Sequence, residues 1–420
     1  MPIIQQFDFF PLTFDDKGKP QSKQELNALI ARASSATDAI FIAHGFRNDV
    51  SDATTLYTNF LKTFRAHLSR PEFQTVAARR FVVGGVYWPS KPFRESFGSG
   101  ADGTRGLHNP AEAVAAAKAQ LEDLKADATP AKRRKLDRAL KLLPTLEGNV
   151  KSQNEFVALV LSVLDRSTLD KTEGLPQIRK KKGSEVLDRL STPTRARDRG
   201  IGDVFGTVAG GVGQFLNLAL WYVMKDRSGS VGAKGAADAV RALHAACPKI
   251  RIHLVGHSLG GRLIAGCAKA LGEAPKLQPD SVMLLEAAFS HFGFSADNGR
   301  GNAGFFRDVI TKRVVKGPFL STFSAQDTVV GKAYSLMSRL AGDDVREIGD
   351  AADQFGGIGR NGPQKTKEVA SFPLHQPGTA YKYKDGVINN LDGSGGLIKD
   401  HGDVTNDAIT YAFASAVART

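Results

Sequence analysis

A serine, and an acid and a histidine that follow it, are the residues of this sequence whose types and order could do chemistry. Ser258 is the centre of residues 256–260, Gly-His-Ser-Leu-Gly, a G-x-S-x-G pattern. Residues 251–255 before it have the composition of a buried strand, and those from 259 onward that of a helix. A serine on such a sharp turn is held in a strained backbone conformation, which projects its hydroxyl beside the first amides of the helix. We therefore expect Ser258 to be a nucleophile.

A serine hydroxyl attacks only when a base takes its proton, and a carboxylate must hold that base. His401 lies in a Gly-containing loop just before a predicted helix at 405–417. His375 lies between two prolines in an irregular stretch, and His291 is close in sequence to the serine. We predict that His401 is the base. Its alternative role is to cap the helix that follows, for which Asp403 is better suited.

Two acids could orient the histidine, and each stands at the carboxyl end of a predicted strand. Asp327 follows the strand 319–324, and Glu286 belongs to the end of the strand 282–287. We favour Asp327 and keep Glu286 as the alternative. Asp327 could instead be a turn residue that caps the helix beginning at 329.

Strands and helices alternate over most of the chain. Short apolar runs such as 39–43 are typical of strands buried in a parallel sheet. Predicted strands are 3–13, 39–43, 80–88, 250–256, 282–287, 319–324 and 381–389, and predicted helices 23–33, 52–69, 233–246, 259–272 and 405–417. The sequence therefore predicts an α/β fold with a mostly parallel central sheet.

This alternation is interrupted by residues 91–224. A Gly-rich loop at 92–110 precedes helical patterns at 111–125, 130–143 and 153–164, with no strand between them. The apolar stretch 203–224 approaches the length of a membrane span, but polar residues and glycines inside it favour a buried helix. We interpret 91–224 as a helical cap or lid inserted between two parts of an α/β core, 1–90 and 225–420.

The serine motif also carries a family resemblance. Residues 256–261, Gly-His-Ser-Leu-Gly-Gly, resemble the nucleophile elbow of the α/β-hydrolases, and in particular that of lipases and esterases. The resemblance covers roughly 36–90 and 225–420 and does not extend to the insertion. It implies an α/β-hydrolase fold and a serine hydrolase activity.

The same resemblance implies roles for further residues. The position of Asp327 looks like the acid loop after the seventh strand of the family, whereas Glu286 stands where some lipases carry their acid. The position of His401 matches the family's catalytic histidine loop. Two backbone N–H groups should bind the oxyanion of the tetrahedral intermediate, that of Leu259 and, in a His-Gly-Phe loop after the strand 39–43, that of Phe46.

Three other histidines are expected to be structural. His44 precedes the serine in the chain, so we expect a loop residue and not the base. His253 lies inside a strand and is expected to be packed. His257, the residue before the serine, is expected to support the elbow or border the pocket.

Charge and cysteine content limit the partners. The 420 residues carry a formal charge of +13, and residues 125–200 hold 18 Lys/Arg against 10 Asp/Glu. This basic segment is either a solvated helical surface or a contact for an anionic surface. The basic run 179–182 has no interleaved aromatics, so no nucleic acid is expected. Cys247 and Cys267 indicate neither a disulfide framework nor a zinc site.

These observations converge on one expectation. The chain is predicted to be a serine hydrolase that cleaves carboxylic esters, either small molecules or lipid and acyl esters, without a metal or cofactor. The alternatives are amide hydrolysis or another acyl transfer on the same triad, and a non-catalytic protein that binds an anionic surface through its basic insertion. With no secretory signal and no transmembrane span predicted, the expected location is the cytoplasm.

Overall fold

The structure is a computed structural model that describes residues 3–90, 110–126, 128–164, 175–191, 208–341 and 351–420. The predicted Gly-rich loop at 92–110 lies almost entirely outside the described residues. So does the beginning of the apolar stretch predicted at 203–224. The elements below refer to the described part of the chain.

Nine strands form one mixed sheet in the order β1-β2-β4-β3-β5-β6-β7-β9-β8. Only β1 and β2 pair antiparallel, and every other neighbouring pair is parallel. The strands are β1 Ile3–Ile4, β2 Phe7–Thr13, β3 Asp38–Ala43, β4 Phe81–Tyr87, β5 Arg251–His257, β6 Ser281–Leu285, β7 Phe319–Phe323, β8 Val369–Pro373 and β9 Ile388–Asp392. The prediction of an α/β fold with a mostly parallel sheet is confirmed.

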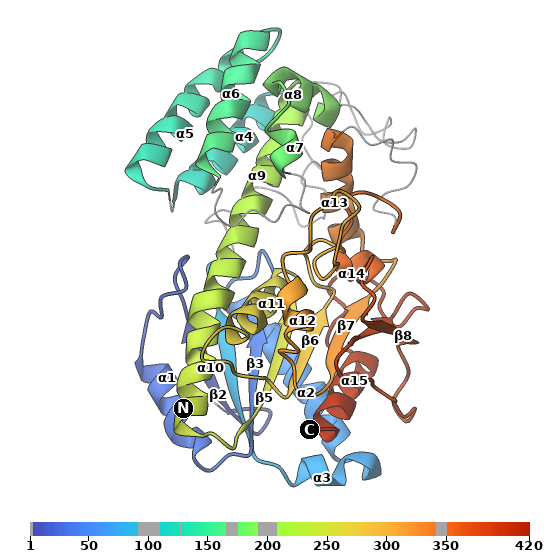
Figure 1. The fold of residues 1–420 in the computed structure, drawn as a ribbon. Coiled ribbons are helices and arrows are strands. Elements are labelled where there is room, and N and C mark those ends of the chain that lie inside the picture. The colour runs from blue at the N-terminus through green and yellow to red at the C-terminus, as the bar shows by residue number, and fades with distance from the viewer. Residues whose placement is uncertain (1–2, 91–109, 127, 165–174, 192–207, 342–350) are drawn as a thin grey trace.

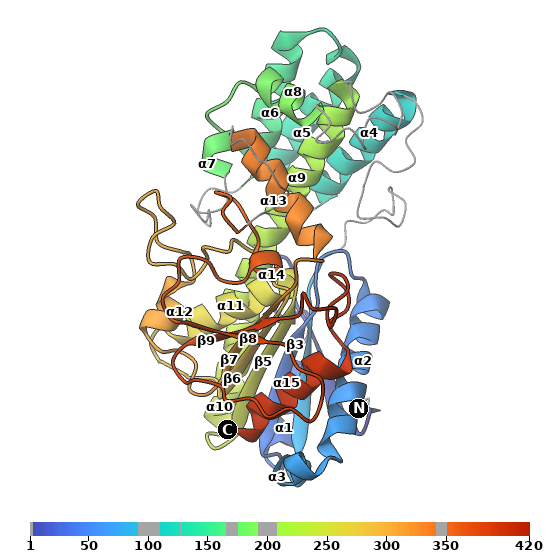
Figure 2. The same ribbon diagram turned by 90° about the vertical axis from the view of Figure 1, so that its right-hand side faces the viewer.

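Helices cover both faces of the sheet, which explains why its central strands are largely apolar and almost completely buried. All residues of β3, β4 and β6 are buried. One face is covered by α1 Gln24–Ala33, α10 Ala237–Ala246, α11 Leu259–Leu271 and α12 Arg307–Thr311. The other is covered by α2 Val50–Leu68, α3 Gln74–Ala77 with the 3₁₀ turn Pro71–Phe73, and α15 Asp407–Ala418, which lies beside α2 (Figure 2).

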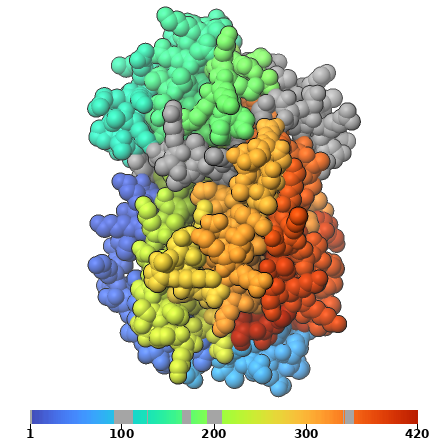
Figure 3. Space-filling model, viewed as in Figure 1, coloured from blue at the N-terminus to red at the C-terminus, as the bar shows by residue number. Residues whose placement is uncertain are grey.

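A group of helices, here called the helical region, lies at one end of the molecule, beyond the carboxyl ends of the strands (Figures 1 and 3). Its helices are α4 Pro110–Ala126, α5 Pro130–Leu142 followed by the 3₁₀ turn Leu143–Thr145, α6 Val150–Val163, α7 Leu175–Ile178 and α8 Gly183–Ser191. No strand lies between these helices in the described residues, as the sequence predicts.

Two helices connect the helical region to the core. α9, Val208–Ser230, contacts α4 and α8 at one end and α11 at the other, and it continues through a π-helical turn, Val231–Ala236, into α10. α13, Thr328–Ala341, begins close to the end of β7 and reaches α7 and α8, while the short α14, Ile358–Asn361, packs beside it (Figure 1). The boundary predicted at residue 224 thus falls inside a helix that continues without a break into the core.

The apolar core is continuous from the sheet into the helical region. Phe215 and Leu216 of α9 are fully buried, and the Phe215 ring contacts that of Phe156 in α6 at 6.2 Å between ring centroids. One cluster of buried side chains therefore joins the two parts. None of the helices among the described residues is long and apolar enough to cross a membrane.

Candidate active site

The candidate site lies at the carboxyl ends of four neighbouring strands, β3, β5, β6 and β7. In the sheet, β3 lies between β4 and β5. The chain runs from β3 to β4 on one side and then crosses to β5 on the other side. In open parallel sheets such a reversal of strand order leaves a crevice at the carboxyl ends, and ligands commonly bind there. Most of the predicted site residues follow these strands: His44 to Phe46 after β3, Ser258 after β5, Glu286 after β6 and Asp327 after β7. The predicted base, His401, lies in the loop between β9 and α15.

Ser258 occupies the turn between β5 and α11 in a strained backbone conformation, with φ 57° and ψ −122°. The two glycines of the motif make this turn possible. A Cβ atom on Gly256 would overlap the carbonyl of Gly260, and one on Gly260 would overlap the carbonyl of Ala43. The G-x-S-x-G spacing is therefore required by the close approach of β5, α11 and the end of β3.

The three predicted residues form a continuous chain of hydrogen bonds. Ser258 Oγ lies 2.8 Å from His401 Nε2, and His401 Nδ1 lies 2.8 Å from Asp327 Oδ2. Ser258 and Asp327 are buried, while the His401 side chain is 14% exposed. The geometry is that of a nucleophile, a base and an orienting acid.

The other two histidine candidates lie elsewhere. The His291 ring is fully buried, and its Nδ1 is 3.2 Å from the amide nitrogen of Asn361. The backbone N–H of His375 donates to the Tyr381 hydroxyl, and its ring packs on that of Tyr381. Of the three histidines, the structure brings only His401 to Ser258.

Asp327 makes both contacts that its position suggests. One carboxylate oxygen, Oδ2, accepts from His401, while Oδ1 accepts a hydrogen bond of 2.9 Å from the backbone N–H of Val330 at the start of α13. The cap fixes the carboxylate on a rigid helix terminus. Because the helix holds one oxygen, the other is directed at the imidazole.

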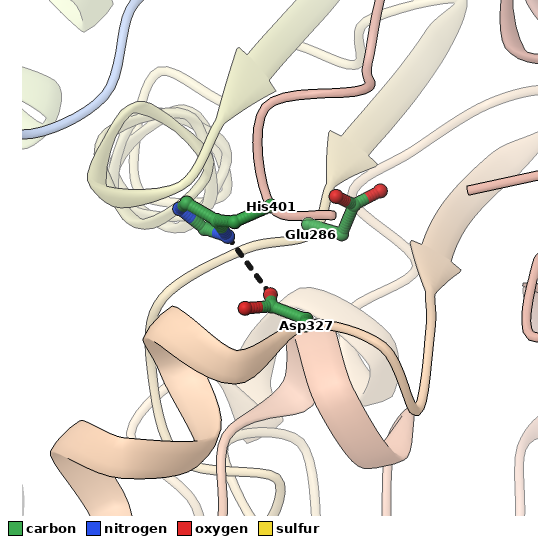
Figure 4. Close-up of side chains that lie close together, drawn as sticks. All are labelled: Glu286, Asp327 and His401. Carbon is green, nitrogen blue, oxygen red and sulfur yellow. Dashed lines mark hydrogen bonds and ion pairs between the residues drawn. The ribbon is translucent and has the colours of Figure 1, made fainter. Parts of the chain in front are cut away.

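Glu286, the alternative acid, is fully buried next to this chain and has a positive φ of 41°. Neither of its carboxyl oxygens has a hydrogen-bond partner among the described residues. Burial, and secondly the charge of Asp327, raise the pKa of Glu286 well above its usual value. A neutral carboxyl group cannot supply the negative charge that orients an imidazolium, so the electrostatics favour Asp327. Figure 4 shows the Glu286 carboxyl group turned away from Asp327.

In the described part of the chain, one group of three His, Cys, Asp or Glu side chains lies close enough together to hold a metal ion. One ligand atom from each of Glu286, Asp327 and His401 falls within 4.8 Å of the others. Two of these residues are already joined by a hydrogen bond of 2.8 Å (Figure 4). In the structure this group therefore consists of a hydrogen-bonded histidine–carboxylate pair with a second carboxyl group beside it.

The loop after β3 passes directly over the nucleophile. A Cβ atom on Gly45 would lie 2.9 Å from Ser258 Cβ and 3.4 Å from Ser258 Oγ, so only glycine fits without displacing the serine. Phe46 is the next residue of this loop. Leu259 is the first residue of α11, where backbone N–H groups have no partner within the helix. The two expected oxyanion donors therefore belong to segments that flank Ser258.

His44 and His253 are structural, and their hydrogen bonds show how. His44 Nδ1–H donates to the carbonyl of Gly45, and its Nε2 accepts from the backbone N–H of Trp88. Burial lowers the pKa of His44 to about 4, so the ring stays neutral and holds the loop. The His253 ring is buried between Asp38 and Ser281, 3.0 and 2.8 Å away.

Side chains of α9 contact Phe46 at the site and the neighbouring helix α13, and sequence reasoning did not identify these contacts. The ring of Trp221 in α9 contacts that of Phe46 edge to face, with centroids 6.2 Å apart. Lys225, also in α9, donates to the Tyr334 hydroxyl of α13 at 2.6 Å, and both side chains are buried. The only signal in the sequence was the apolar character of 203–224, which predicts a buried helix but not what it contacts.

Buried neutral histidines make the fold sensitive to acid. Burial lowers the pKa of His44 to about 4, and the pKa values of His257 and His291 to about 3. In the unfolded chain each would bind a proton near pH 6.5, so the unfolded state binds more protons below that pH. We expect the free energy of unfolding to fall between pH 6.5 and about 4, by a few kcal/mol for each histidine. Urea denaturation of Glu286→Gln at pH 7 and pH 4.5 measures this, because the raised pKa of Glu286 would shift the stability of the wild type in the opposite direction. Equal stability of this variant at the two values would contradict the prediction.

Comparisons of the chain with models of known protein families, with curated proteins and with solved structures find no match. The site is therefore characterised by its geometry alone. That geometry comprises a strained serine, a histidine in contact with it, a buried carboxylate that holds the histidine, and a glycine loop packed on the serine.

Proposed function

We propose that this chain is a serine hydrolase that cleaves carboxylic esters through a covalent acyl-enzyme. The observation that carries the proposal is the unbroken hydrogen-bond chain from Ser258 Oγ through His401 to Asp327, with the serine on a strained turn. A buried serine that only stabilised the turn would not need a histidine held by a second buried group. In this proposal the core is an α/β-hydrolase fold, and the helical region with α9 is its cap.

The reaction follows from the positions of these atoms. His401 Nε2 takes the proton of Ser258 Oγ as that oxygen attacks the ester carbonyl carbon. Asp327 remains ionised and stabilises the imidazolium. The backbone N–H groups of Leu259 and Phe46 bind the developing oxyanion. The imidazolium then protonates the leaving alcohol, and a water molecule, activated by the same nitrogen, hydrolyses the acyl-enzyme.

The apolar side chains beside the site support an acyl substrate. Phe46 follows the glycine that packs on the nucleophile, and its ring contacts Trp221 of α9. Trp221 and its neighbours on this helix form part of the apolar cluster that continues into the helical region. A hydrocarbon chain bound beside Ser258 would meet these side chains, which is why we propose lipid or other acyl esters as substrates.

A second candidate, an anionic surface as partner, is favoured by α5. This helix carries six basic residues against one acidic residue, and most of them are exposed: Lys132, Arg133, Arg134, Lys135, Arg138 and Lys141, with Asp137. Asp137 pairs with Lys125, and Arg138 with Glu155. The net positive charge of the helix could attract an anionic lipid surface, so contact with such a surface stays a prediction.

A panel of substrates tests the proposed reaction. We expect kcat/KM for p-nitrophenyl esters to rise with acyl chain length beyond acetate, because a longer chain buries more apolar surface at about 0.8 kcal/mol per methylene. Matched p-nitroanilides should be cleaved much more slowly. Ser258→Ala supplies the blank for each substrate.

The outcomes separate the alternatives. Anilides cleaved as fast as esters would make the chain an amidase. A fluorophosphonate that fails to label the wild-type chain, together with no turnover of any substrate, would favour the anionic-surface binding function instead.

A further inference from the structure

The residue before the nucleophile contacts the base directly. His257 is the second residue of the G-x-S-x-G motif, and the residue is 7% exposed. Its Nε2 lies 2.8 Å from the backbone carbonyl oxygen of His401, and the two imidazole rings are 4.8 Å apart between centroids. The side chain therefore joins the nucleophile elbow to the loop that carries the base.

The protonation of His257 follows from this contact. A carbonyl oxygen only accepts, so Nε2 carries the hydrogen and donates it to His401. Burial, and secondly the neighbouring His401, lower the pKa of His257 to about 3, which keeps the ring neutral. Its Nδ1 has no hydrogen-bond partner among the described residues. That atom faces the loop after β3, which carries Phe46, because a Cβ atom on Gly45 would lie 3.2 Å from it.

His401 needs such support because it lies outside the regular elements, between β9 and α15. Its ring is held by Ser258 and Asp327, and its backbone carbonyl by His257. The two ring contacts change during the reaction, since the proton moves from the serine to the imidazole and then to the leaving group. The contact with His257 involves no moving proton and persists throughout.

We propose that His257 is a positioning residue that fixes the backbone of His401 and so keeps His401 Nε2 within reach of Ser258 Oγ. This inference rests on the proposed function and goes further, because it assigns a task to a side chain outside the triad. A neutral ring suits the task, since a cation at this position would oppose formation of the His401 imidazolium. A displacement of about 1 Å at a catalytic group can cost about 10²-fold in rate.

Two substitutions test the hydrogen bond itself. His257→Leu introduces an apolar side chain of similar size that has no hydrogen-bond donor. In His257→Gln, the amide nitrogen reaches roughly the position of Nε2 and can donate to the same carbonyl. We expect His257→Leu to lower kcat about 10- to 100-fold with little change in KM, and to slow fluorophosphonate labelling of Ser258 by a similar factor. His257→Gln should recover most of both rates.

A matched control comes from His67. Its ring is also buried, and its Nε2 lies 3.0 Å from the backbone carbonyl of Asp407, joining α2 to α15 away from the site. We expect His67→Leu to lower the melting temperature without lowering kcat.

The low-pH limb of the kcat/KM profile should show a single proton in the wild type and in His257→Leu, because His257 is not charged above about pH 3.

Each contrary result has one meaning. The inference is overturned if His257→Leu behaves as His67→Leu does, losing stability but not kcat. It is also overturned if Gln and Leu reduce kcat equally, or if the low-pH limb changes from two protons to one in His257→Leu. Wild-type chain that is neither labelled nor active would instead overturn the proposed function, and the inference with it.

Discussion

We expect Ser258→Ala to lower kcat for a p-nitrophenyl ester by about 10⁴-fold or more and to abolish fluorophosphonate labelling. The substitution removes the only atom that can form the acyl-enzyme, while His401 and the flanking amides remain in place. The residual rate would come from water activated by His401 and from the oxyanion donors. KM should change little, because the lost interaction forms a covalent bond and contributes little to substrate binding.

The fold should survive this change. Ser258 is buried, and its backbone makes the hydrogen bonds that fix the turn: its N–H donates to the Leu285 carbonyl, and its carbonyl accepts from Gly261 and Ala288. Alanine can keep all of these. A melting temperature close to that of the wild type would show that lost activity does not reflect unfolding.

Ser321 offers a matched control for the serine. It is also fully buried, on β7, and its Oγ has no hydrogen-bond partner among the described residues. Ser321→Ala should therefore keep turnover and labelling. Labelling that persisted in Ser258→Ala at the wild-type rate would show that another side chain is the nucleophile.

The central strands could be predicted from the sequence because their signal is local. Residues 39–43 form a continuous apolar run, as do 81–88 of the predicted strand 80–88, and the structure has β3 and β4 there. The edge of the sheet was harder to predict. β8 was not predicted, because it is partly exposed and its composition is not distinctive, and β9 begins only at Ile388, at the end of the predicted strand 381–389.

Polar residues inside β9 explain that error. Asn389 and Asn390 are buried in the strand, and the Asn389 amide bonds to the backbone of Lys384 and Phe319. Such partners become visible only when distant segments are assembled. Asparagine is typical of turns, so nothing local in the sequence indicates that the strand begins at Ile388 and continues to Asp392.

The order of the site residues was predictable, but their contacts were not. In a parallel sheet, residues that follow neighbouring strands must meet at one edge, which brings Ser258, Asp327 and Glu286 together whatever their side chains do. The choice between the two acids depends on where each carboxyl group points. The bond from His257 to the His401 backbone, and the approach of Trp221 to Phe46, likewise depend on packing between segments far apart in the chain.

The two acids therefore give the second decisive experiment. We expect Asp327→Asn to lower kcat by about 10³- to 10⁴-fold and Glu286→Gln to change it by no more than a few-fold. In Asp327→Asn the amide oxygen can still cap α13 through the Val330 N–H, so the helix should keep its start. The amide cannot match the carboxylate at His401 Nδ1, however, because it lacks the negative charge that stabilises the imidazolium and favours the wrong tautomer.

Glu286→Gln replaces a group that is already neutral, so the charge of the site does not change. The raised pKa of Glu286 also sets the direction of its effect on stability. The folded protein keeps this proton, whereas the unfolded chain releases it near pH 4.5. The free energy of unfolding of the wild type therefore falls as the pH rises from 4.5 towards the pKa of Glu286 in the folded protein. Glutamine has no proton to lose, and we expect Glu286→Gln to be more stabilising, relative to the wild type, at pH 8 than at pH 4.5. Urea denaturation at both values, run beside the kinetics, measures this. If Glu286→Gln lost turnover while Asp327→Asn kept it, the orienting acid would be Glu286.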